Sequence, residues 1–67
     1  MIILGRRIRE AREEKGLVQS QLAEILHIDQ TNISRWESGI FEPSAEMILK
    51  ICKALDCDPN YLFGFGE

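Results

Sequence analysis

Long apolar runs are missing from this sequence, as are low-complexity tracts and internal repeats. A helix that crosses a membrane needs about 20 consecutive apolar residues, and the apolar start, residues 1–4, is too short for a span or a signal peptide. No segment alternates apolar and polar residues as a half-buried strand does. We therefore expect one all-α domain, residues 1–67, with a small core that dimerisation would help to stabilise.

Residues with reactive or metal-binding side chains are scarce. The chain has two cysteines, Cys52 and Cys57, and one histidine, His27. Two thiols and a distant histidine form a poor ligand set for zinc, and we interpret both cysteines as core or near-surface thiols in a reducing cytoplasm. There is no glycine-rich phosphate loop, and no serine or cysteine forms a catalytic set with the histidine. The sequence predicts no enzyme, no cofactor and no metal site.

An excess of positive charge is missing too. The chain has eight basic and eleven acidic residues and a net charge of −3, although DNA-binding domains usually carry a basic surface. Residues 1–41 are balanced, and residues 42–67 carry the whole acidic excess. Non-specific attraction to phosphates should therefore be weak, and any binding to nucleic acid must depend mainly on specific contacts.

Apolar periodicity and helix-end signals predict five helices. They are expected at residues 4–15, 19–26 and 30–38, after Ser44, and from Asp58-Pro59 onward. Asp29 can cap the third helix with its carboxylate, and Gly39 can end it with a left-handed backbone. His27, after the second helix, must take a positive φ that glycine adopts more easily.

Residues 19–38 are the most informative part of the chain. They hold two short helical patterns joined by a tight break, and Ile33 and Trp36 mark the buried face of the second pattern. Its first turn, Gln30-Thr31-Asn32, is polar, and these side chains can donate and accept hydrogen bonds as the reading of base edges requires. The arrangement predicts a helix-turn-helix that reads the DNA major groove.

Over about residues 4–63 the chain resembles the Cro/phage-repressor (XRE-type) helix-turn-helix family. The matching positions are Gly16-Leu17, Gln19, Leu22-Ala23, Leu26, Ile28, Ile33-Ser34-Arg35-Trp36-Glu37, Gly39, Pro43-Ser44, Ala54-Leu55 and Leu62. The resemblance implies a compact five-helix, lambda-repressor-like domain that binds double-stranded operator DNA, commonly as a homodimer. We expect a sequence-specific transcriptional regulator, a repressor that binds a palindromic operator.

Candidate site residues follow from the resemblance, position by position. The residues that match positions facing base edges are Gln30, Thr31, Asn32 and Arg35. Glutamine and asparagine side chains pair well with adenine, and arginine can hold a guanine or a phosphate. Gln19 matches a family glutamine that contacts the DNA backbone and braces the first reading residue. Glu37 matches a glutamate that pairs with an arginine of the first helix, here Arg12, so a partly buried ion pair is expected.

Three departures from the family pattern affect contacts with the DNA backbone. Val18 replaces a residue that often caps the second helix, a loss of about 1 kcal/mol, and His27 replaces the usual glycine. Residues 40–42 replace a loop that is often basic, which leaves Ser38 and the edge of Phe41 for backbone contacts. Arg6, Arg7 or Arg9 could supply the missing charge, and the sequence does not decide among them.

The C-terminal segment, residues 61–65, is too apolar for a free tail. We expect Leu62 in the core and Trp36 as a core anchor rather than a stacking platform. Phe63 and Phe65 are candidates for a two-fold dimer interface, and core packing is the alternative for both.

Two other readings of the chain remain open. A protein-interaction module of the same fold, antitoxin-like or an anti-regulator, would account for the acidic charge and for Glu42, whereas the polar turn of residues 30–32 favours DNA. The chain could also be the DNA-binding part of a longer protein, although Met1 and Glu67 fit a complete small one.

Overall fold

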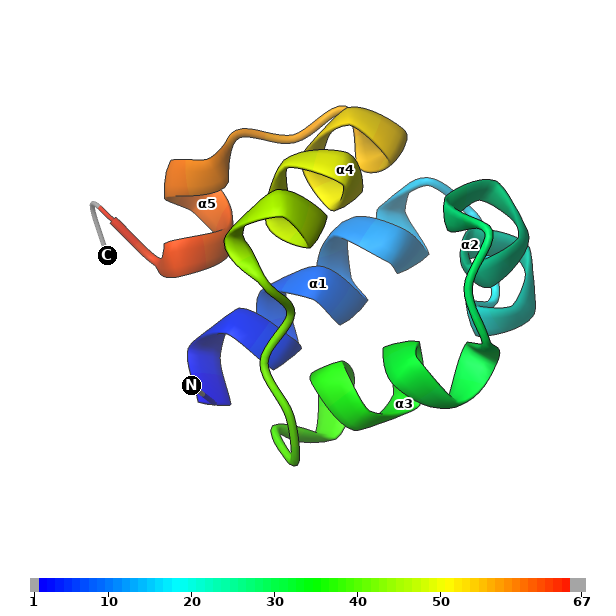
Figure 1. Cartoon of the computed structure of the whole chain (residues 1–67). Helices are drawn as coiled ribbons and strands as arrows, with labels where there is room; N and C mark the ends of the chain where they lie inside the picture. The colour runs from blue at the N-terminus through cyan, green and yellow to red at the C-terminus, as the bar shows by residue number, and fades with distance from the viewer. Residues whose placement is uncertain (1, 66–67) are drawn as a thin grey trace.

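Five helices follow one another in a computed structural model that describes residues 2–65 (Figure 1). They are α1 (Ile2–Glu14), α2 (Gln19–Leu26), α3 (Gln30–Ser38), α4 (Ala45–Leu55) and α5 (Pro59–Phe63). The expected bounds of α2 and α3 are confirmed, whereas α1 begins two residues before Leu4 and ends before Lys15. Residues 2–65 contain no strand, so the all-α prediction is confirmed. None of the described helices is long and apolar enough to cross a membrane.

Side-chain caps explain why three of the helices begin where they do. The carboxylate of Asp29 accepts a hydrogen bond from the Thr31 backbone N–H at 2.8 Å, and the Ser44 hydroxyl accepts one from Met47 at 3.1 Å. Asp58 caps α5 in the same way, ahead of a proline in the first turn. Each cap satisfies a backbone donor that the helix itself leaves without a partner.

Helix α2 begins without a side-chain acceptor, because Val18 occupies its cap position. The Gln21 amide oxygen instead accepts a hydrogen bond from the Val18 backbone N–H at 2.8 Å. This is half of a capping box, in which the side chain at the third helical position reaches back to the cap residue. Gln21 therefore offsets part of the loss expected at Val18, and the signal for it was present in the sequence.

Two helices end at a residue other than glycine in the left-handed region. His27 follows α2 with φ 57°, as expected, and Asp56 follows α4 with φ 53°, which the sequence did not suggest. Histidine and aspartate tolerate this conformation better than most side chains. The tight turn after α2 therefore forms without glycine.

The core is built from all five helices around α1, which lies between α3 on one side and α4 and α5 on the other (Figure 1). The most deeply buried large side chains are Ile8, Leu22, Ile33, Ile51, Leu55 and Leu62. Trp36 is 8% exposed and belongs to this cluster, which confirms its role as a core anchor. Leu62 is also confirmed in the core.

Both cysteines are free thiols, as expected, with Cys52 buried and Cys57 half-buried. Burial raises the pKa of the Cys57 thiol to about 12, and the neighbouring Cys52 adds to the effect. Cys57 is therefore protonated near neutral pH and is a poor nucleophile. No group of three or more potential metal ligands is brought together within residues 2–65.

Helices α1 and α3 lie in close contact at Gly5, a buried residue that was not predicted to have a role. A methyl group at Gly5 would collide with the carbonyl oxygen of Trp36 and would lie 3.0 Å from that of Glu37. Because both atoms belong to the backbone of α3, they cannot rotate away. The missing side chain at Gly5 therefore sets the distance between the two helices.

We expect Gly5→Ala to destabilise the protein, by about 1–3 kcal/mol in the free energy of unfolding, because α1 must move away from α3. The sign is diagnostic, since glycine to alanine inside an unobstructed helix stabilises by roughly 0.5–1 kcal/mol. Urea unfolding followed by circular dichroism measures the change. A variant more stable than the parent chain would show that the helices are not in close contact here.

Candidate nucleic-acid interface

Helices α2 and α3 form the expected helix-turn-helix, and α3 lies on the outside of the molecule (Figure 1). Residues 27–29 connect them, and the side chain of Ile28 packs against the core from within this turn. Helix α3 packs against α1 and α2 through Ile33 and Trp36. Its opposite face is left open to solvent.

The four residues predicted to contact base edges all lie on this exposed face. Gln30, Thr31 and Asn32 form the first turn of α3, and Arg35 follows one turn later. All four are exposed, whereas Ile33, which lies between Asn32 and Arg35, and Trp36, which follows Arg35, are buried. Helical spacing therefore separates a polar outer surface from the apolar anchor of the same short helix.

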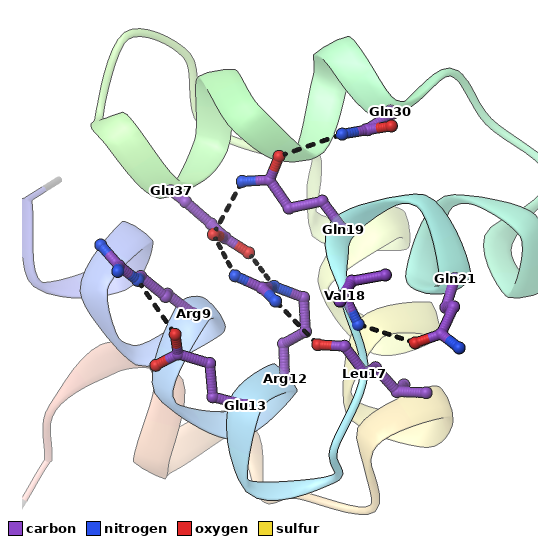
Figure 2. A network of polar contacts seen from close by, with 9 residues as sticks. All are labelled: Arg9, Arg12, Glu13, Leu17, Val18, Gln19, Gln21, Gln30 and Glu37. Carbon is purple, nitrogen blue, oxygen red and sulfur yellow. Dashed lines mark hydrogen bonds and ion pairs between the residues drawn. The ribbon is translucent and has the colours of Figure 1, made fainter.

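The expected ion pair between Arg12 and Glu37 is present and is hydrogen-bonded at both ends (Figure 2). Arg12 Nε donates to Glu37 Oε2 at 2.7 Å and Nη2 donates to Oε1 at 3.0 Å, while Nη1 donates to the Leu17 carbonyl at 2.7 Å. The two side chains are 9% and 5% exposed. The hydrogen bond to Glu37 raises the pKa of Arg12 above its ordinary value. The pair joins α1 to α3, and Arg12 also binds the connection between α1 and α2 through the Leu17 carbonyl.

Two glutamines extend this ion pair to the exposed face of α3 (Figure 2). Gln19 Nε2 donates to Glu37 Oε1 at 3.1 Å, and Gln30 Nε2 donates to Gln19 Oε1 at 3.4 Å. Because a carboxylate only accepts hydrogen bonds, Glu37 orients the Gln19 amide, and Gln19 in turn orients that of Gln30. Gln30 thus keeps its oxygen and one N–H directed away from the network.

The N-terminal cap of α3 is electrostatically favourable. The hydrogen bond from the Thr31 backbone N–H lowers the pKa of Asp29, and the charge of Arg35 contributes in the same direction. A lowered pKa means that the cap stabilises the folded state at neutral pH and that this contribution is lost as the pH falls through the lowered value. The first turn of α3 is therefore anchored by a charged cap.

Two adjoining hollows flank the exposed face of α3. One, of about 340 Å³, is lined by Arg9, Arg12, Gln19, Ser34, Glu37 and Ser38. The other, of about 380 Å³, is lined by Gln19, Asp29, Gln30, Thr31 and Ser34. They share Gln19 and Ser34, and Ser34 lies one helical turn after Gln30, a spacing from which it could have been predicted.

The structure places two of the three flanking arginines, Arg9 and Arg7, beside different helices. Arg9 lines the first of these hollows, whereas the guanidinium of Arg7 lies 4.5 Å from the centre of the Tyr61 ring, on α5. Arg9 makes an exposed ion pair with Glu13 at 3.4 Å (Figure 2). Such a pair contributes only about 0.3–0.5 kcal/mol. Of these two arginines, Arg9 is the one whose charge lies beside α3 and is readily available to a ligand.

The last residue of α3 and the loop that follows both contact Arg35. The Ser38 hydroxyl donates to the Arg35 carbonyl at 3.2 Å, and the ring of Phe41 lies 5.4 Å from Arg35 Cζ. Both residues are exposed, so the expected backbone contacts with DNA remain a prediction. The contact between Phe41 and Arg35 was missed, because it depends on the reversal of the chain after α3.

The dimer candidates lie at the surface, away from the core. Phe63 is 38% exposed and Phe65 is 77% exposed. Core packing, the alternative for both, is wrong, whereas the interface role stays a prediction. Helix α5 lies on the other side of α1 from α3 (Figure 1).

A third hollow, of about 440 Å³, lies away from the face of α3. It is lined by Ala11, Glu14, Lys15, Leu55, Asp56, Cys57, Asp58 and Tyr61. Lys15 pairs there with Asp56 at 3.8 Å. The acidic residues of the turn between α4 and α5 are thus separated from α3 by the body of the molecule (Figure 1).

A helix-turn-helix family model matches residues 8–62 of this chain. Repressor protein C2 of Salmonella phage P22 is 37% identical over 60 residues, which is 90% of this chain and 28% of that protein. The transcriptional regulator ImmR of Bacillus subtilis is 34% identical over 64 residues, 96% of this chain and 50% of ImmR. The chain therefore spans half or less of the length of these relatives.

Solved structures agree with the fold. The restriction-modification controller protein C.AhdI from Aeromonas hydrophila matches with a TM-score of 0.85 and 39% identity, over 92% of this chain and 94% of that one. The P22 c2 repressor, in complex with a synthetic operator, matches with a TM-score of 0.82 and 37% identity, over 88% of this chain and 89% of that one. The predicted five-helix architecture and the resemblance to the repressor family are both confirmed.

We expect Glu37→Gln to lower the free energy of unfolding by roughly 3–5 kcal/mol, because it leaves the buried charge of Arg12 without a counter-charge. Glu13→Gln is the matched control: it breaks the exposed pair with Arg9 and should cost less than about 0.5 kcal/mol. Replacing both buried partners, Arg12→Met with Glu37→Met, should be milder than the sum of the two single changes. Equal, small effects of Glu37→Gln and Glu13→Gln in urea unfolding would refute a structural role for the pair.

Proposed function

This chain belongs to the helix-turn-helix family, and on that premise we propose that it is a sequence-specific DNA-binding transcriptional regulator that represses from a palindromic operator as a cytoplasmic homodimer. One observation carries the proposal. The exposed first turn of α3 presents the Gln30 amide with its N–H directed to Gln19 at 3.4 Å, and Gln19 is in turn oriented by the buried pair of Arg12 and Glu37. Folding alone does not require an exposed amide such as that of Gln30 to be oriented by other side chains.

In the proposed complex, α3 enters the major groove with its N-terminal half against the bases. The free oxygen and remaining N–H of Gln30 suit the exocyclic amine and N7 of adenine, which take one donor and one acceptor. Thr31 offers a methyl group to thymine, and Asn32 offers a second amide. Arg35, one turn later, supplies the donors that guanine or a phosphate accepts.

Contacts with the DNA backbone are proposed for the two sides of α3. Gln19 and Ser38 border the hollow beside α3, and Arg9 supplies positive charge on the same side. Phe41 offers the edge of its ring at the C-terminal end of α3. Because the acidic turn between α4 and α5 lies away from α3, it would not face the phosphates. The small number of basic contacts predicts weak non-specific binding and a shallow dependence on salt.

The names of the relatives support this function. The P22 protein is described as a repressor and has been solved on an operator, ImmR as a transcriptional regulator, and C.AhdI as a controller protein. None is described as an enzyme. Because this chain spans half or less of the first two, further activities of those proteins are not transferred to it.

Selection from random duplexes tests the proposal, and we expect an enriched, roughly palindromic sequence. On that sequence, Gln30→Ala and Arg35→Ala should each lower discrimination by about 1–3 kcal/mol while the fold is retained. Asn60→Ala and Lys50→Ala, which remove an exposed amide and an exposed charge from α5 and α4, are the matched controls and should leave binding unchanged. Affinity is measured by fluorescence anisotropy at several salt concentrations.

Two outcomes would contradict the proposal at different levels. If no duplex is enriched, the regulator reading fails and a protein-interaction module of the same fold takes its place. If a sequence is enriched but the α3 variants bind it as the parent does, the chain reads DNA through other residues.

For the dimer, we expect Phe63→Glu or Phe65→Glu to raise the monomer fraction in sedimentation, because a charge would be buried at an apolar two-fold interface. A symmetric dimer would place two copies of α3 about 34 Å apart, one turn of DNA. Leu49→Glu, at an exposed apolar position of α4, controls for a general effect of added charge. An unchanged dimer in both phenylalanine variants would move the interface elsewhere.

A further inference from the structure

Arg35 and Phe41 form a cation–π pair at the C-terminal end of α3. The guanidinium carbon of Arg35 lies 5.4 Å from the centre of the Phe41 ring. This is within the distance at which a cation is attracted to the face of an aromatic ring. The pair joins a residue of the exposed reading face to a residue of the loop that follows.

Backbone hydrogen bonds bring the two side chains together. Gly39 takes φ 82°, which reverses the chain at the end of α3. The N–H groups of Ile40 and Phe41 then both donate to the Arg35 carbonyl, at 3.0 and 3.3 Å. Phe41 is therefore attached, through its own backbone, to the residue whose side chain it covers.

Neither side chain has another evident structural task. Phe41 is 56% exposed and is not part of the core cluster. Within residues 2–65, Arg35 takes part in no salt bridge, and the one carboxylate known to feel its charge is Asp29, at the other end of α3. An exposed ring beside an exposed cation contributes little to folding and is positioned to control where that cation lies.

We propose that Phe41 is a positioning residue for Arg35, and that Arg35 so held reads a guanine. This proposal rests on the proposed function. It names guanine as one base of the DNA target, Arg35 as the residue that reads it, and Phe41 as the residue that positions Arg35. The guanidinium is planar and its N–H groups lie in its plane, so attraction to the face of a ring leaves them available to a ligand. Those in-plane donors match O6 and N7 of guanine in the major groove.

The position of the pair favours a base over a phosphate. Arg35 lies one turn after Thr31 and Asn32 on the same exposed face, so its side chain continues the row of proposed base contacts. The ring of Phe41 limits the directions in which the long arginine side chain can extend. A limited set of rotamers lowers the entropy lost when the contact forms, which is how a preorganised side chain gains affinity.

The experiment compares Phe41→Leu with Phe41→Tyr on the selected operator and on duplexes with each guanine replaced in turn. Phe41→Leu should lower the preference for guanine at one base pair about two- to fivefold, and Phe41→Tyr should retain it. Ile40→Ala, at the adjacent exposed position, is the matched control and should change nothing. Circular dichroism verifies the fold of each variant.

A double-mutant cycle separates positioning from direct contact. In an Arg35→Ala background, Phe41→Leu should no longer change the preference for guanine, because the ring would have no guanidinium to position. If instead Phe41→Leu weakens binding to every duplex equally, with or without Arg35, the ring acts only through its proposed contact with the DNA backbone, and the positioning of Arg35 is overturned. An effect on no duplex overturns it as well.

A measurement without DNA keeps the two proposals distinguishable. In the free protein, the ring should shift the Arg35 side-chain proton resonances upfield, and Phe41→Leu should abolish that shift. If the shift is present and a duplex is selected, the cycle above decides. If no duplex is selected, the regulator function and the reading of guanine both fail; if the shift is absent, only the positioning role of Phe41 fails.

Discussion

The buried ion pair of Arg12 and Glu37 is the contact on which the rest of the site depends. It joins α1 to the last turn of α3, where an acid would otherwise oppose the helix dipole. Its net contribution to stability is small, since both charges lose their hydration, but removing one partner would be expensive. What it provides is geometry: Glu37 orients Gln19, and Gln19 orients Gln30 at the surface.

This arrangement accounts for how an acidic chain can be built to read DNA. Charge alone would attract it only weakly, because the basic and acidic residues of the first 41 positions cancel. Two of the four side chains proposed to read bases, Gln30 and Arg35, instead lie against a neighbouring side chain, and the helix turn that carries the other two is capped. Asp29 caps the first turn of α3, Gln19 holds Gln30, and Phe41 covers Arg35. Preorganisation lowers the entropy lost on binding, so fewer phosphate contacts are required.

Much of the fold could be predicted, because its signals are local. Asp29, Ser44 and Asp58 cap helices through hydrogen bonds to residues two or three positions away, and apolar spacing marked the buried face of each helix. The start of α1 and the left-handed turn at Asp56 were not predicted, since neither carries a strong local signal. The role of Gly5 was missed because it depends on how close the backbone of α3 comes to α1.

The sequence by itself determined the five helices, the outward-facing polar turn of α3 and, through family resemblance, the partnership of Arg12 with Glu37. Only the tertiary structure decided which of the flanking arginines lies beside α3, that Phe63 and Phe65 stay outside the core, and that Phe41 meets Arg35. The physical reason is the distance along the chain over which each kind of interaction acts. Helix periodicity and capping act within about one or two turns, whereas these contacts depend on how α1, α3 and the following loop are placed against one another.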